Sequence, residues 1–378
     1  MSIIAPRFPS LLLFSPSALL GCLALAGSFA FPRNLPAQAR DAGARMERVA
    51  ENVYAIIHDD ATDEWPHGNT GVVVTDAGVL VIDATYLPSL ARADIALIRS
   101  VTRQQVRYLV YTHWHFDHND GAVAYTEAFP GLTVVSERES AQFLALNATW
   151  WSRMSTAPNS ARRAALAALE KAVADQRDST GRPLSADTLS RTRKAVAQRK
   201  AELNELASLK VITPNLVFDR ELTLELGGRR IELRDRGRAN SPHDVTIYLP
   251  DARVLFSGDV LVQSPLPYVG ASWPVPWIGV LRELETIPIT ALVPGHGPVM
   301  HDHSYTRQVR ELLEAATSRV AAMAREGKTL EQIQATLTLD DIRARTPAWQ
   351  APDLKADWET NTKALVERTW RGVRGQGG

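Results

Sequence analysis

The chain has 378 residues, of which 45% are hydrophobic and 22% are charged. These fractions are near the averages of soluble globular proteins and argue against a disordered chain, a collagen-like repeat or a multi-span membrane protein. The 42 basic residues are balanced by 42 acidic ones, and Cys22 is the single cysteine. The composition therefore speaks against a nucleic-acid-binding protein and excludes both an intrachain disulfide and a zinc site built on several cysteines.

Residues 1–39 are typical of an export signal. A mostly apolar stretch spans residues 11–31, and Ala37 and Ala39 form a small-residue cleavage site. We therefore expect a periplasmic or secreted protein. Two alternatives stay open, because Cys22 follows Leu-Leu-Gly as in a lipoprotein and because the apolar stretch is long enough to serve as an uncleaved membrane anchor.

The first half of the remaining chain alternates between strands and helices. Short β-branched runs bounded by Gly, Asp or Asn predict the strands, and segments between them predict helices. In chain order we expect strands at 53–57, 71–74 and 79–83, a helix over 91–101, a strand at 106–111, a helix from about 121 and a strand at 132–136.

Between about residues 140 and 209 the pattern changes to an Ala-rich, charge-rich segment. Apolar residues recur there at helical spacing in two stretches, which predicts two helices. The connection at 178–183 has the composition of a turn, so we expect an antiparallel helical hairpin. Three roles stay open for this insertion: a lid over the active site, a dimer contact or a solvated appendage.

Strand signals return after Pro214. We expect a hairpin over 222–233 with its turn at Gly227-Gly228, then strands at 245–249 and 254–256, a helix that Gly327 ends and a last helix over about 357–371. Strands in two batches, each followed by helices, indicate a layered α/β sandwich with the helices outside.

The strongest chemical feature is the segment His113-Trp114-His115-Phe116-Asp117-His118, directly after an apolar strand. Because His113 and His115 are two residues apart, an extended backbone directs both imidazoles the same way. Asp117 and His118 lie in the turn toward the next helix and face a second point, so the spacing suits two adjacent metals. Imidazole and carboxylate donors favour zinc, although iron and manganese accept the same donors.

This segment resembles the H-x-H-x-D-H signature of the metallo-β-lactamase superfamily, and three more landmarks follow in that family's order. Asp83 ends an apolar strand, Asp259 ends another in Ser-Gly-Asp, and His296 lies in Pro-Gly-His-Gly-Pro. The resemblance implies an αββα sandwich with a dinuclear zinc site at one edge. It further implies that Asp259 bridges the two metals and that His296 binds the second one.

We place the metallo-β-lactamase-like domain at residues 45–303, with the helical insertion inside it, and a helical C-terminal extension at 304–378. In the second metal's set, Asp117 is expected both to bind metal and to orient the attacking hydroxide. Asp83 and Thr112 are candidates to hydrogen-bond the outer nitrogens of the metal-binding histidines, which are the ring nitrogens that do not face the metal.

One landmark departs from the family pattern. Where the family has a third histidine for the first metal, the register from Asp244 and the following strand places Asn240. An amide oxygen is a weaker donor than imidazole. Three interpretations stay open: Asn240 binds the metal weakly, Asn240 hydrogen-bonds a metal-bound water, or His243 is the ligand. The expected content is accordingly one or two zinc ions per chain.

The sequence thus predicts an exported, zinc-dependent hydrolase that uses a metal-bound hydroxide on a small-molecule ester, lactone, thioester or amide. One alternative is β-lactam hydrolysis, although the true metallo-β-lactamases of the family carry cysteine or serine where this chain has Asp259. A second alternative is a non-catalytic metal-binding accessory protein, because the third histidine is missing. We expect no nucleic-acid partner and no membrane contact beyond an N-terminal anchor, and the oligomeric state stays open.

Overall fold

The computed structural model describes residues 43–58, 67–148, 150–263 and 266–375. The predicted export signal lies outside these residues. Within the described part of the chain, no helix combines the length and the apolar character needed to cross a membrane.

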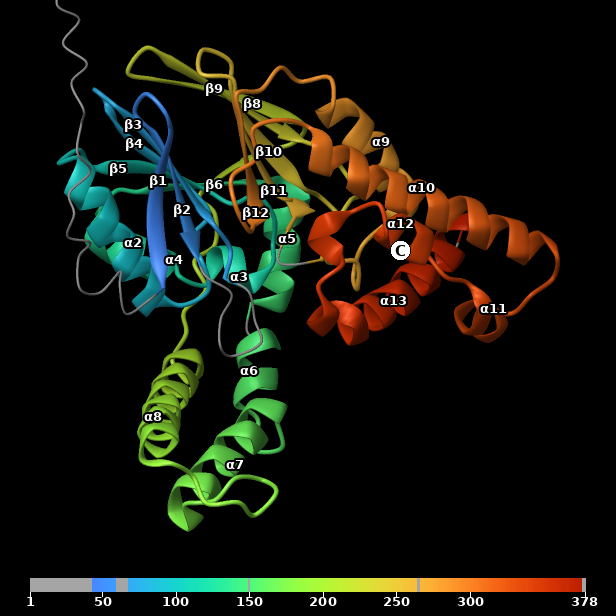
Figure 1. The fold of residues 1–378 in the computed structure, drawn as a ribbon. Helices are drawn as coiled ribbons and strands as arrows, with labels where there is room; N and C mark the ends of the chain where they lie inside the picture. The colour runs from blue at the N-terminus through green and yellow to red at the C-terminus, as the bar shows by residue number, and fades with distance from the viewer. Residues whose placement is uncertain (1–42, 59–66, 149, 264–265, 376–378) are drawn as a thin grey trace, which may run out of the picture. The chain divides into compact units, whose positions relative to one another are not determined.

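A seven-stranded sheet forms the first half of the fold (Figure 1). Its strands lie in chain order: β1 (Ala44–Ala50), β2 (Val53–His58), β3 (Thr70–Thr75), β4 (Gly78–Ile82), β5 (Val106–Val110), β6 (Thr133–Glu137) and β7 (Leu216–Phe218). Neighbours from β1 to β4 are antiparallel, and neighbours from β4 to β7 are parallel. The parallel pairs are joined through helices, as a crossover between parallel strands requires.

The second sheet has five strands in the order β12-β11-β10-β9-β8. Their bounds are β8 (Glu221–Leu226), β9 (Arg229–Asp235), β10 (Val245–Leu249), β11 (Val254–Val262) and β12 (Ala291–His296). β11 and β12 pair in parallel, whereas the other pairs are antiparallel. The predicted hairpin across Gly227-Gly228 is the β8–β9 pair.

One hydrophobic core fills the space between the sheets. Leu80 and Ile82 of the first sheet share this cluster with Ile247, Phe256 and Val293 of the second, and all are at most 2% exposed. Every residue of β4 is buried, since its other face lies under helices. The two sheets therefore pack face to face, as the sequence pattern indicated.

Helices cover the outer faces of both sheets (Figure 1). α2 (Pro88–Val101) and α4 (Ala122–Ala128) lie on the first sheet, and α2 has a proline in its first turn, where a helix needs no backbone donor. α9 (Pro274–Leu284), α10 (Ser304–Arg325) and α13 (Lys355–Val373) share a core cluster with Leu255 and Leu292 of the second sheet. The predicted αββα sandwich is confirmed.

The insertion contains more helices than predicted: α5 (Arg138–Asn147), α6 (Trp150–Thr156), α7 (Ala161–Asp175) and α8 (Ala186–Ala207). α7 and α8 form the expected hairpin, and Asp178 accepts hydrogen bonds from Thr180 and Arg182 in its turn. The periodicity does not predict α5 and α6 as separate helices, because helices this short show few repeats of an apolar face. The periodicity does not predict β1, in which Arg45, Glu47 and Arg48 interrupt the apolar pattern, or the three-residue β7.

The other helical elements of the described residues are α3 (Phe116–Asn119), α11 (Leu330–Thr336), α12 (Asp340–Arg343) and two 3-10 turns (Pro347–Trp349 and Pro352–Leu354). Buried Trp349 and Trp358 join the cluster that holds α9 and α10. The boundary between a domain at 45–303 and an extension at 304–378 stays a prediction.

Replacing Phe256 by Ala will destabilise the fold by about 3–5 kcal/mol, because it removes a large ring from the core between the sheets. Chemical denaturation of the purified variant measures this change. Leu146→Ala is the matched control, since Leu146 is 83% exposed and its removal leaves no cavity. Equal losses in the two variants would contradict the assignment of the core.

Candidate metal centre

The carboxyl ends of strands from both sheets meet at one edge of the sandwich. β5 leads into Thr112 and His113, and His115 lies at the N-terminus of the short helix α3, which carries Asp117 and His118. From the second sheet, β11 carries Asp259 and β12 ends at His296. Ligand sites at the carboxyl ends of strands are common in layered α/β folds.

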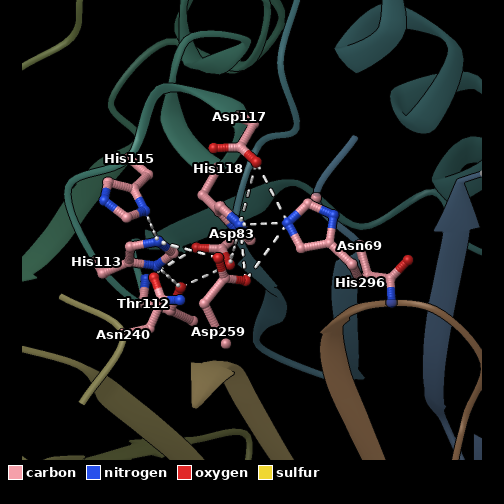
Figure 2. A network of polar contacts seen from close by, with 12 residues as sticks. Asn69, Asp83, Thr112, His113, His115, Asp117, His118, Asn240, Asp259 and His296 are labelled. Atoms are coloured by element: carbon pink, nitrogen blue, oxygen red, sulfur yellow. Dashed lines mark hydrogen bonds and ion pairs between the residues drawn. The ribbon is translucent and has the colours of Figure 1, made fainter. Parts of the chain in front are cut away.

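Six of these side chains form two groups that can each hold a metal ion. The first group is His113, His115 and Asp259, and the second group is Asp117, His118 and His296. In each group, one ligand atom per residue lies within 4.8 Å of the others. Figure 2 shows the two groups side by side, with Asp259 between them.

Asp259 faces both groups at once. Its Oδ2 lies 3.6 Å from His113 Nε2, and its Oδ1 lies 3.2 Å from His118 Nε2 and 3.4 Å from His296 Nε2. One carboxylate with an oxygen toward each group has the geometry of a bridge between two ions.

A hydrogen-bond network behind the groups orients two of the histidines. Asp83 accepts bonds from the Thr112 backbone N–H, the Thr112 hydroxyl and His118 Nδ1, each at 2.8 Å. The Thr112 hydroxyl in turn accepts from His113 Nδ1 at 3.0 Å. These bonds place the ring protons on Nδ1, so Nε2 of both histidines faces the centre as a donor to metal. Asp83 and Thr112 thus make the contacts expected of them.

The buried charges of the site favour a cation. Burial alone would raise the pKa of Asp117 and of Asp259, but the charges of His118 and His296 lower both, so the carboxyls stay ionised. Burial lowers the pKa of His118, yet Asp259, Asp83 and Asp117 outweigh it and raise the pKa well above the ordinary value, so the surrounding carboxylates favour a positive charge here, which a metal ion would supply in place of a proton. Burial also lowers the pKa of His113, which keeps its ring neutral and able to bind metal.

Asn240 lies beside the first group, next to His113 and Thr112 in Figure 2. It is fully buried, and its Nδ2 donates to the backbone oxygen of Tyr268 at 3.1 Å. Its Oδ1 has no hydrogen-bond partner among the described residues. A buried oxygen normally has a partner, so a metal ion or a bound water fits this position. The donor sets as a whole therefore suit two ions.

His243 lies outside both groups. Its Nδ1 contacts Asp235 Oδ2 at 3.1 Å, and its Nε2 contacts Glu139 Oε2 at 2.9 Å. Both ring nitrogens are thus engaged by carboxylates. Of the three interpretations of the missing histidine, the structure brings the two that involve Asn240 to the site and does not bring His243 there.

Residues 63–325 match the family model described as the metallo-beta-lactamase superfamily, which is more than half of the chain. The chain belongs to the metallo-β-lactamase superfamily. This confirms the family, and with it the class of hydrolase, that the motifs indicated.

A linear primary-alkylsulfatase from Pseudomonas sp. is 23% identical to the chain over 313 residues, which are 79% of this chain and 54% of that protein. Among solved structures, a stereoselective inverting sec-alkylsulfatase from Pseudomonas sp. matches with a TM-score of 0.58 at 18% identity, over 88% of this chain and 51% of that one. A metallo-β-lactamase from Pontibacter korlensis matches with a TM-score of 0.51 at 18% identity, over 72% and 99%. The chain thus spans about half the length of these alkylsulfatases, and the solved structures are similar in fold.

Replacing Asp83 by Ala will weaken metal-ion binding about 10–100-fold, because His118 loses the partner that fixes its ring. Competition with a chelating dye measures the affinity. Asp76→Ala, which removes an exposed carboxylate in the β3–β4 turn, serves as the control and is expected to bind the metal ion like the wild type. Unchanged affinity in Asp83→Ala would contradict the orienting role.

His243 stabilises the fold in a pH-dependent way. Its hydrogen bond to Asp235, with the nearby charges of Asp235, Glu137 and Glu139, raises its pKa to about 9. Because the folded pKa lies above the unfolded value, this stabilisation is complete below about pH 6.5 and is lost as the pH rises through about 9. His243→Gln will therefore cost about 1–2 kcal/mol at pH 6, after allowance for solvent screening, and much less near pH 10. Denaturation curves at the two pH values test this, and an equal cost at both would contradict it.

Proposed function

We propose that the chain is a zinc-dependent hydrolase with two adjacent ions, acting on a small-molecule ester, lactone, thioester or amide. The observation that supports this most directly is Asp259, whose two oxygens face two separate groups of imidazole and carboxylate donors. Such donors favour zinc, and no cysteine is among them.

Zinc ions held by these groups would lower the pKa of a coordinated water and polarise the substrate's carbonyl or ester oxygen. The chain's own residues then have distinct tasks. Asp117 Oδ2 lies 3.2 Å from His296 Nε2 at the second group, where its carboxylate can both bind metal and orient the attacking water. Asp83 and Thr112 hold the imidazoles of His118 and His113 in position.

Hydrolysis of an alkyl sulfate ester is a second candidate. It is supported by the relative described as a linear primary-alkylsulfatase, which aligns with 79% of this chain. Hydrolysis of β-lactams remains an alternative with less support, since the motivation for it is the fold and the predicted export. A non-catalytic metal-binding role is the third alternative.

The helical insertion is proposed to act as a lid. A cavity of about 1570 Å³ lies between the α7–α8 hairpin and the start of α2, with His67 and Leu87 in its wall. Leu206 of α8 packs on Tyr86 and Leu87, and Phe116, the neighbour of Asp117, packs on the same cluster. The base of the hairpin is therefore close to the metal centre. We further propose that the protein works in the periplasm or outside the cell.

Purified protein will hydrolyse at least one substrate from a panel of p-nitrophenyl acetate, a lactone, a thioester, an anilide, dodecyl sulfate and nitrocefin. A chelator will abolish the activity, added zinc will restore it, and Asp259→Asn will lower it at least about 100-fold. Asp251→Asn, an exposed carboxylate, is the control and will stay active. Release of sulfate from dodecyl sulfate would favour alkyl sulfate hydrolysis, and rapid turnover of nitrocefin alone would favour β-lactam hydrolysis. Zinc binding without any hydrolysis would overturn the proposal in favour of an accessory role.

The number of metal ions per chain tests whether Asn240 completes the first group. After dialysis against trace zinc, mass spectrometry will find two ions per chain in the wild type and in Asn240→His, because the amide oxygen completes the first group. One ion in the wild type and two in the variant would contradict this, and would mean that the first group needs an imidazole that the chain lacks.

A further inference from the structure

Asn69, in the loop before β3, is bonded to the loop that carries His296. Its Nδ2 donates to the backbone oxygens of Pro294 at 3.0 Å and Gly297 at 2.9 Å. Its backbone N–H donates to the oxygen of Gly295 at 2.7 Å. One residue, only 4% exposed, therefore holds three backbone carbonyls on both sides of His296.

His296 depends on such backbone contacts more than His113 and His118 do. The outer ring nitrogens of His113 and His118 are fixed by Thr112 and Asp83. The outer nitrogen of His296, Nδ1, is buried and has no hydrogen-bond partner among the described residues. Because no described side chain bonds Nδ1 and so fixes the ring from behind, the direction of His296 Nε2 follows from where the backbone of its loop lies.

The loop before β3 also contacts the second group from its other side. Gly68 N–H donates to the backbone oxygen of Asp117 at 3.2 Å. A Cβ at Gly68 would lie 2.6 Å from that oxygen and 2.8 Å from His118 Nδ1, so only glycine permits this approach. The same short loop is thus in contact with the backbone of Asp117, the ring of His118 and the loop of His296.

A buried polar network fixes the loop in turn. His58 Nδ1 bonds the backbone oxygen of Gly68 at 2.8 Å, and its Nε2 contacts Asp94 at 2.9 Å. The Thr70 hydroxyl donates to the other oxygen of Asp94 at 2.8 Å. Because these groups are fully buried, breaking the network leaves unpaired polar atoms, which makes the loop a rigid support.

We propose that Asn69 is the positioning residue for His296: its carboxamide sets the loop of residues 294–297, and so sets the direction of His296 Nε2 toward the second metal. This inference rests on the proposed function, because it requires that the second group binds zinc.

The test is a double-mutant cycle on zinc affinity. Asn69→Ala is expected to weaken one of the two zinc affinities about 10–100-fold and to leave the other unchanged. In a His296→Ala background, Asn69→Ala will cause no further loss, because its effect passes through the ring that is already absent. If Asn69→Ala instead disturbs the structure in general, its loss of zinc affinity will add to the loss that His296→Ala causes.

Asn215→Ala is the matched control. Asn215 also joins two segments, since its Oδ1 accepts from Val134 N at 2.8 Å and its Nδ2 donates to Leu132 O at 3.4 Å, but it belongs to neither group. It will leave both zinc affinities unchanged. If Asn69→Ala does not purify as a folded protein, Asn69→Ser, which keeps one donor, is measured instead and is expected to weaken the same affinity by a smaller factor.

The outcomes separate the inference from the function on which it rests. If the wild type binds no zinc, or His296→Ala binds it as well as the wild type, the proposed metal centre is wrong. If His296→Ala loses one affinity while Asn69→Ala binds like the wild type, or if the two losses add, the centre stands and the positioning role of Asn69 is overturned.

Discussion

The structure depends on placing one carboxylate, that of Asp259, between two groups of donors, each of which combines side chains from both sheets. Asp259 lies on β11 of the second sheet, whereas His113 and His118 follow β5 of the first. Contacts of 3.2 to 3.6 Å between them require the edges of the two sheets to meet closely. Gly258 permits this, since its φ is +50° and a Cβ there would lie 2.7 Å from Thr112 Cβ.

That arrangement gathers buried carboxylates and imidazoles that would be unfavourable without a shared cation. The fold surrounds them with groups of fixed direction: Asp83 and Thr112 behind two histidines, and Asn69 beside the loop of a third. Asp83 itself has a φ of 60°, a conformation that costs energy for a residue with a side chain and that is held here by its bonds to Thr112 and Val110. Strain of this kind is common where geometry serves function.

The ligand segment could be predicted from sequence because its geometry is local. Two histidines two residues apart point the same way from an extended backbone, and Asp117 and His118 at the following turn face a second point. Both directions can be predicted without knowing the rest of the fold. Asp259 and His296 were found through the family's motif order. Strands and long helices followed from periodicity, whereas the short α5, α6 and β7 carry too few residues to show one.

The contacts that position the site could not be predicted, because they join distant residues. Asn69 and Pro294 are 225 positions apart, and His58 and Asp94 are 36 apart. His243 shows the same limit: it lies three residues from Asn240, but its partner Glu139 is 104 residues away and draws its ring out of the site. Sequence proximity suggested a ligand, and tertiary charge pairing gave the side chain another place.

X-ray absorption spectroscopy of the zinc-loaded protein tests the central claim most directly, since it measures both the donor atoms and the separation of the ions. A centre bridged by Asp259 predicts a zinc–zinc distance of about 3.5–4 Å and a shell of nitrogen and oxygen donors without sulfur. A spectrum with no zinc–zinc contribution from protein that holds two ions per chain would contradict the bridged centre.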